Sequence, residues 1–172
     1  MIILIFLIIC FSSNAFSFAE EYLYILNDKC IVNLYSAAMQ YFSGSGIELI
    51  KDTHGLIIRI NTYDNLSIDE KVFDKIVKIK YFLAKIKNPV IIEVHAGRDF
   101  QKNLEKYRNW EVTTLIANEL ETIILTYGEP LNNKRIKSVG YGEFFPQRNT
   151  SNNGGKDSSR IDIIVLCNVI GE

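Results

Sequence analysis

The sequence has 172 residues, of which 48% are hydrophobic and 23% are charged, and its formal net charge is -1. This composition supports a packed core and so excludes a chain that is disordered throughout. The near-zero net charge gives no electrostatic argument for binding nucleic acid or an anionic membrane surface. The length suits one domain with a short N-terminal addition.

Residues 1–19 are expected to form an export signal. An apolar run from Met1 to Phe11 precedes small residues, and cleavage after Ala15 or Ala19 would satisfy the small-x-small requirement. No Lys or Arg precedes the run, so a retained anchor stays open as an alternative. Contact with a membrane is therefore expected only through the N-terminus. A helical segment, residues 20–46, is expected to follow.

The three cysteines raise two separate questions. Cys10 would allow a lipoprotein, although Ile9 stands where lipoprotein signals have a small residue. Cys30 and Cys167 would share an oxidising compartment in an exported chain, which allows one disulfide between the N-terminal segment and the last strand. Two buried, reduced thiols are the alternative.

The first half of the chain predicts a helix and then a hairpin. Apolar residues at helical spacing predict the helix between Asp28 and Phe42. Two short apolar runs, residues 47–50 and 56–60, flank a polar stretch and predict two strands joined by a turn. We interpret His54, in that stretch, as a turn residue, since no second His or Cys accompanies it.

The middle of the chain predicts helix, strand, helix. Ser67 and Glu70 have the spacing of a capping box, so Ser67 is expected to begin a helix that runs to about Lys87. Residues 90–95 form an apolar run typical of a buried strand. A second helix is predicted from about 110 to 127.

The last third of the chain holds two partly alternating apolar runs around a polar loop, which predicts two strands with an exposed connection. Gly140 and Gly142 bracket Tyr141, where the backbone must bend or approach a neighbour closely. The element order is then helix, strand, strand, helix, strand, helix, strand, strand. It predicts an α+β fold in which helices pack on one face of a mixed sheet.

Residues of the last third also match a known signature in order and spacing. The matching residues are Gly140, Tyr141, Gly142, Glu143, Pro146, Asn149, Ser151, Gly154, Arg160, Ile161, Asp162 and Ile163. They resemble the motifs G-y-G-e-x-x-P, N-x-T-x-x-G-R and N-R-R-V-E-I of the OmpA-like, peptidoglycan-associated domain family. The family has Arg, Asn and Arg where this chain has Gly155, Ser158 and Ser159.

By this resemblance, the chain is identified as a divergent member of that family. The resemblance covers roughly residues 47–169, within an expected domain at 47–172. It implies a two-layer sandwich with a β-α-β-α-β-β core, to which the N-terminal helix is added.

The resemblance also implies where a ligand would bind. In the family, the strand before the second helix ends in G-H-T-D, and that helix begins with N-x-x-L-S-x-x-R-A. The Asp and that Arg hold the zwitterionic end of diaminopimelate, because a carboxylate pairs with an ammonium and a guanidinium binds a carboxylate through two hydrogen bonds. Here His95 is kept, Gly97 replaces the Asp and Ile116 replaces the Arg. Asn109 begins the helix motif, and Thr113 takes the place of the Ser, where we expect it to be the N-cap.

The loss of both charged partners predicts weak or absent peptidoglycan binding, because such a site forfeits several kcal/mol. A shifted site is the alternative, since Arg98 and Asp99 directly follow Gly97 and Arg160 survives from the N-R-R pair. We interpret His95 as structural, with its ring in a strand-end hydrogen bond, rather than catalytic.

Two functions without catalysis stay open. The first is a periplasmic envelope protein, associated or not with the outer membrane, that binds or once bound peptidoglycan. The second is a subunit of an envelope complex, such as a secretion system or motor, that acts through protein contacts; an exposed apolar patch centred on Ile116 would favour it. An enzyme is poorly supported, because the sequence has no nucleophile elbow, H-E-x-x-H, metal-spaced Cys/His set or phosphate loop. No cofactor, metal or nucleic-acid partner is expected.

Overall fold

The structure is a computed structural model of the chain, and it describes residues 29–63, 66–97, 100, 108–144 and 159–167. Several predictions concern positions outside the described residues. They are the export signal, Cys10, Arg98, Asp99, Pro146, Asn149, Ser151, Gly154, Gly155 and Ser158.

Helices and strands follow one another in the predicted order after an N-terminal helix that is described over residues 29–41. The further elements are β1 (Glu48–Asp52), β2 (Gly55–Tyr63), α2 (Glu70–Leu83), β3 (Val90–His95), α3 (Asn109–Thr126), the short 3-10 helix η2 (Asn133–Arg135), β4 (Ile136–Gly142) and β5 (Ser159–Leu166).

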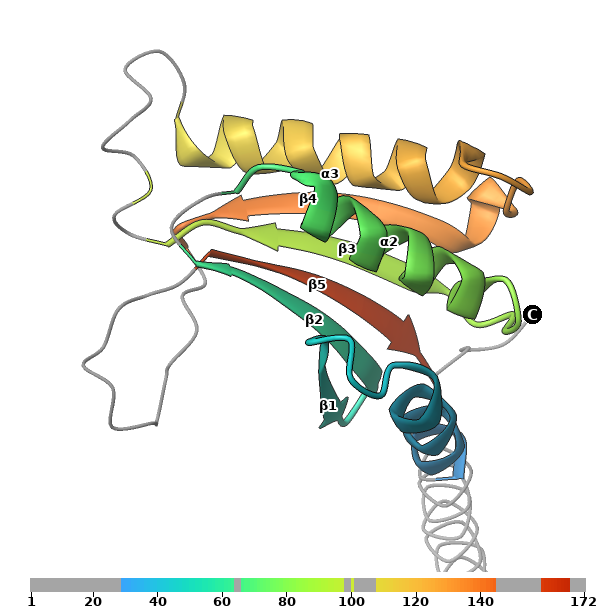
Figure 1. Cartoon of the computed structure of the whole chain (residues 1–172). Helices are drawn as coiled ribbons and strands as arrows, with labels where there is room; N and C mark the ends of the chain where they lie inside the picture. The colour runs from blue at the N-terminus through green and yellow to red at the C-terminus, as the bar shows by residue number, and fades with distance from the viewer. Residues whose placement is uncertain (1–28, 64–65, 98–99, 101–107, 145–158, 168–172) are drawn as a thin grey trace, which may run out of the picture.

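The strands form one five-stranded sheet in the order β1-β2-β5-β3-β4. β3 and β4 are parallel, and the other neighbouring strands are antiparallel. The last strand, β5, therefore lies in the centre of the sheet, and α2 and α3 both lie on one face of it (Figure 1). The predicted α+β fold, with a mixed sheet and helices on one face, is confirmed. The predicted hairpin is β1 and β2, and His54 lies in its turn.

Successive side chains of the three central strands alternate between the two faces of the sheet. The residues that face α2 and α3 are buried and apolar. They are Leu56, Ile58 and Ile60 of β2, Val90, Ile92 and Val94 of β3, and Ile161, Ile163 and Val165 of β5. The side chains between them lie on the face without α2 and α3, which we call the open face.

The start of α2 differs from the prediction. Its N-cap is Asp69, whose carboxylate accepts a hydrogen bond from the backbone N–H of Val72 at 2.8 Å. The predicted capping box that begins at Ser67 is therefore wrong. Asp is at least as good an N-cap as Ser, and Asp69 takes that position two residues later.

Two cations connect the ends of α2 and α3. The ammonium of Lys80, on α2, is buried and donates to the backbone carbonyls of Tyr127 and Glu129, just beyond α3. Arg135, which follows α3, donates in return to the carbonyl of Leu83 at the end of α2, at 2.8 Å. Positive charge is favourable at helix C-termini, where backbone carbonyls lack helical partners. The two helices are thereby fixed to each other at this end.

The N-terminal helix is joined to the domain by packing and by a covalent bond. Phe42, directly after the helix, lies with its ring centroid 5.1 Å from that of Phe82 on α2. A disulfide links Cys30 to Cys167, at the end of β5 and 137 positions away in sequence. Among the helices of the described ranges, none has the length and apolar character needed to cross a membrane.

Candidate functional site

The N-terminal end of α3 lies directly on the end of β4. A Cβ atom at Gly140 would come within 2.2 Å of the backbone nitrogen of Thr114, which is far inside contact distance. Gly142 has a φ of 56°, and a Cβ atom there would be 3.0 Å from the backbone nitrogen of Trp110. The prediction that the backbone bends or comes close to a neighbour at both glycines is confirmed.

The expected N-cap role of Thr113 is wrong. The N-cap of α3 is Arg108, and its backbone N–H donates to the carboxylate of Glu111 at 2.7 Å. Thr113 is fully buried within the helix, and its hydroxyl accepts a hydrogen bond from the backbone N–H of Gly142 at 2.9 Å. The helix begins one turn before Thr113, which therefore ties α3 to β4 instead of starting the helix.

Gly97 lies just beyond β3 at this same end of the sheet. The backbone N–H of Ala96 donates to the carbonyl of Gly142 at 2.9 Å. The backbone N–H of Gly97 donates to the hydroxyl of Ser159 at 2.9 Å, and both residues are buried. By the resemblance, the family has an Asp at the position of Gly97 and, at the position of Ser159, the first Arg of the N-R-R motif. A short, uncharged hydrogen bond joins them here.

The two remaining predicted positions on α3 also bring no charge. Ile116 is partly buried and packs against the hydrophobic core. Asn109 is 2% exposed, and its side-chain oxygen has no hydrogen-bond partner within the described ranges. The exposed apolar side chains on this part of α3 are Trp110 (46%) and Leu115 (60%). Ile116 is thus not the centre of an exposed patch.

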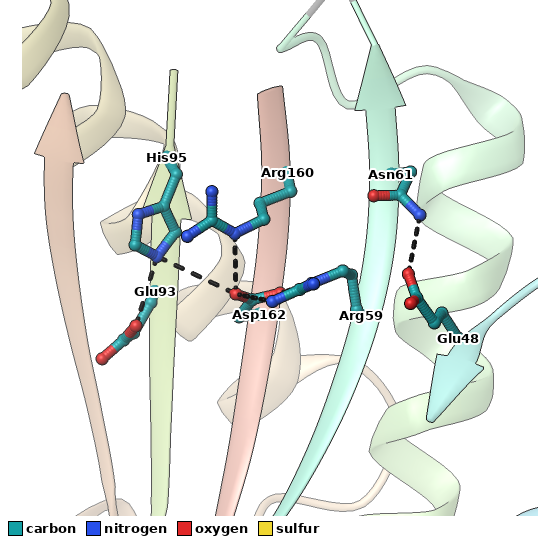
Figure 2. A network of polar contacts seen from close by, with 7 residues as sticks. All are labelled: Glu48, Arg59, Asn61, Glu93, His95, Arg160 and Asp162. Carbon is teal, nitrogen blue, oxygen red and sulfur yellow. Dashed lines mark hydrogen bonds and ion pairs between the residues drawn. The ribbon is translucent and has the colours of Figure 1, made fainter. Parts of the chain in front are cut away.

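Arg160 and His95 lie on the open face, away from α3, as cross-strand neighbours on β5 and β3. Arg160 belongs to a network centred on Asp162 (Figure 2). Arg59 donates Nε–H and Nη2–H to the two carboxylate oxygens of Asp162 at 2.6 and 2.9 Å, and the Nε–H of Arg160 donates to the second oxygen at 2.9 Å. All three side chains are buried. Two guanidinium groups therefore share one carboxylate in the middle of the sheet.

The network controls the ionisation of its members. Burial alone would raise the pKa of Asp162, but the hydrogen bonds and charges of Arg59 and Arg160 outweigh it and hold that pKa below its ordinary value of 3.8. Burial alone would lower the pKa of Arg59, but the hydrogen bond and charge of Asp162 raise it instead. Both groups are therefore charged at neutral pH.

His95 extends the network toward β4. Its Nε2 atom lies 3.2 Å from a carboxylate oxygen of Glu93 and 4.0 Å from one of Asp162. Its ring stacks on that of Tyr141 with a centroid separation of 5.0 Å. The pKa of Tyr141 is raised by burial and further by the charge and hydrogen bond of Glu93. The ring of His95 thus lies between Glu93 and Tyr141, and its buried Nδ1 has no hydrogen-bond partner among the described residues, so its structural role stays a prediction.

Glu93, His95 and Asp162 place ligand atoms within 4.8 Å of one another, a spacing that a metal ion could bridge. Both oxygens of Asp162 already accept guanidinium N–H groups. A cation would have to approach two positive charges and disturb those bonds, which opposes metal binding.

Arg59, Glu93 and Asp162 are residues that the sequence analysis missed as site candidates. Each is a charged residue with an apolar residue on either side, which is the signal that could have revealed them. Their pairing could not be read from the sequence, since Arg59 and Asp162 are 103 positions apart.

Solved structures with a similar fold include a MotB-like protein, a MotB domain and a cell wall anchor. A putative MotB-like protein from Desulfovibrio vulgaris has a TM-score of 0.63 at 17% identity, and the match covers 85% of this chain and 99% of that one. A periplasmic domain of Helicobacter pylori MotB has a TM-score of 0.58 at 16% identity, with 70% and 82% covered. The cell wall anchor of the T6SS from Pseudomonas aeruginosa has a TM-score of 0.53 at 16% identity, with 79% and 96% covered.

Comparison by sequence gives no match, either to a protein-family model or to a curated protein. Sequence identities of 16–17% establish the fold alone. The chain has the OmpA-like fold of the MotB-type domains, as the motifs of its last third predict.

Proposed function

We propose that this chain is a non-enzymatic protein of the bacterial cell envelope, located in the periplasm, whose OmpA-like domain has weak or no affinity for peptidoglycan. Its structural neighbours include a periplasmic MotB domain and a cell wall anchor, which supports the location and the class of protein. The weakened affinity rests on the residues at the ends of β3 and β4.

The main support is the lack of charge at Gly97 and Ile116. The N–H of Gly97 is occupied by the hydroxyl of Ser159, and Ile116 packs against the core. A zwitterionic ligand end needs a carboxylate and a guanidinium that face it, and removal of both typically costs several kcal/mol of binding.

Co-sedimentation with purified peptidoglycan tests this proposal. We expect the wild-type chain to remain largely in the supernatant under conditions that sediment a family domain with the Asp and Arg. The double variant Gly97→Asp/Ile116→Arg should gain roughly tenfold or more in affinity, because it restores both charges. The variant Leu115→Arg is the matched control, since it adds the same charge at an exposed neighbouring position. Wild-type sedimentation equal to that of the reference domain would refute the weakened affinity.

The shifted site at Arg98 and Asp99 is a distinct outcome of the same assay. Strong wild-type sedimentation that Asp99→Ala abolishes, and that Leu115→Arg leaves unchanged, would assign binding to the shifted residues. The envelope location would then stand, and the loss of affinity would be wrong.

A second candidate function is a subunit of an envelope complex that acts through protein contacts. Trp110, Leu115 and Phe144 support it, because their apolar side chains are 46%, 60% and 69% exposed. Site-specific photo-crosslinking in cells tests this candidate. Discrete adducts from positions 110 and 115, but not from exposed position 137 on β4, are expected for a subunit. No adduct at either α3 position would count against it.

A further inference from the structure

A cavity of about 370 Å³ lies on the open face of the sheet, over the polar network. Its floor includes Arg59, Arg160 and Asp162, which are buried. Glu93 and Tyr141 also line it, and because they are only partly buried, their polar atoms lie within reach of solvent. This cavity faces away from α3 and is therefore separate from the positions of Gly97 and Ile116.

Formal charge in the cavity is balanced. Two guanidinium groups, those of Arg59 and Arg160, meet two carboxylates, those of Asp162 and Glu93. The floor charges are already paired through hydrogen bonds of 2.6 to 2.9 Å. A ligand with its own charge would have to separate a buried pair, which leaves a charge uncompensated and is costly. The cavity therefore favours an uncharged ligand.

Hydrogen-bonding capacity remains at Glu93 and at Arg59. Glu93 accepts from Tyr141, and one of its oxygens lies near Nε2 of His95, yet a carboxylate offers about four acceptor positions. Arg59 uses Nε and Nη2 on Asp162, and its Nη1 makes no hydrogen bond within the described part of the chain. A donor on β2 and an acceptor on β3 thus line the same cavity, with Asp162 of β5 between them. A hydroxyl group, which donates and accepts at once, suits such a lining.

The cavity also has an apolar side. Ile57 and Ile164 are cross-strand partners on β2 and β5, both partly buried, and both line the cavity. A ligand with one apolar face could cover them while its polar edge meets Glu93. The volume is near the small end of ligand pockets, which span about 300–1,000 Å³, so it suits a single ring.

From these observations we infer that the open face carries a binding site for an uncharged, polyhydroxylated ring, that is, for a neutral sugar unit. The ring's apolar face rests on Ile57 and Ile164, and its hydroxyl groups bond to Glu93 and Arg59. This inference does not depend on the fate of the peptidoglycan site at α3, because it uses the other face of the sheet.

Saturation-transfer NMR on the purified full-length chain tests the site, with N-acetylglucosamine and glucose as separate probes. Transfer to the ring protons is expected for at least one sugar, with millimolar affinity. Glu93→Gln should raise the dissociation constant about tenfold, because it removes a charged acceptor. Tyr141→Phe, which loses only the rim hydroxyl, provides a second variant should Glu93→Gln fail to fold. Lys137→Gln is the matched control on an exposed residue of neighbouring β4 and should change nothing.

Each other outcome overturns the inference. Absence of transfer from both sugars at about 10 mM would mean that the network serves only to hold the strands together. Equal affinity in wild type and both rim variants would place any sugar elsewhere. Free alanine is the charged comparison, and tighter binding of this zwitterion than of either sugar would show that the ligand class is wrong.

Discussion

The two faces of the sheet are built from the same strands but held together differently. Ile161 and Ile163 of β5 face the helices and are buried among apolar side chains. Asp162, between them, faces the other way and is buried against two guanidinium groups. We call the face that packs against α2 and α3 the covered face. Apolar contacts have no preferred direction, so the covered face tolerates small changes of shape. Each charge on the open face depends on its partners, so that face should fail when a single member changes.

Near-isosteric substitutions at adjacent positions give the largest expected contrast. Asp162→Asn keeps the shape but leaves two buried guanidinium groups without their carboxylate, and it should lower the free energy of unfolding by about 3–5 kcal/mol. Ile163→Val removes one methylene on the covered face and should cost about 0.5–1.5 kcal/mol. Urea unfolding at pH 7 measures both. Equal costs would show that the two faces do not differ in the way described.

Acid should remove part of the same stabilisation. The pKa of Asp162 is lower in the folded chain than its ordinary value of 3.8, so the folded state binds fewer protons there than the unfolded state does. The ion pairs therefore contribute fully above about pH 4, and their contribution falls as the pH drops through the lowered pKa. Urea unfolding of wild type between pH 5 and pH 2.5 should show this loss.

The variant Asp162→Asn is the control for the acid experiment, because it has no proton to gain at that position. Its stability should depend less steeply on pH below 4 than that of wild type. Parallel curves for the two proteins would assign the acid sensitivity to other carboxylates and leave the network without a role in it.

The covered face could be predicted because every second side chain of a strand lies on the same face, and an apolar residue at every second position indicates that this face is buried. Leu56, Ile58 and Ile60 give that pattern for β2 in the sequence itself. The open face could not be predicted to the same depth. The sequence shows that Arg59 and Asp162 interrupt apolar runs, but it does not report the register that places them opposite each other.

The residues of the candidate site could be predicted from the sequence, but their contacts with distant segments could not. The absence of charge at Gly97 and Ile116 follows directly from their identity and the family motif. The hydrogen bond from Gly97 to Ser159 could not be predicted in the same way, because it joins segments 62 positions apart. Thr113 shows the limit of local rules: it has a good capping side chain, but a contact with Gly142 in another element determines what its hydroxyl does.

A substitution where α3 comes close to β4, on the covered face, should lower the free energy of unfolding by a smaller amount than Asp162→Asn does. Gly140→Ala places a methyl group against the backbone of Thr113 and Thr114, which a rotamer change cannot relieve. We expect a loss of about 1–3 kcal/mol, and a larger loss for Gly140→Ser. Lys137→Ala, on an exposed residue of the same strand, should stay within about 0.5 kcal/mol of wild type. A neutral Gly140→Ala would show that α3 can shift on the sheet.

The smallest expected effect comes from the N-cap of α2. It tests whether the cap contributes to the free energy of unfolding independently of the core on the covered face. Asp69→Ala removes the N-cap of α2 and should cost about 1 kcal/mol, whereas Ser67→Ala should be nearly neutral. Combined with Ile163→Val, the cap loss should add to within about 0.5 kcal/mol, because Asp69 is exposed at the start of α2 and Ile163 is buried in the sheet. A strongly non-additive pair in thermal or urea unfolding would mean that the covered face is as interdependent as the ion network. A larger cost at Ser67 than at Asp69 would restore the capping box to the start of α2.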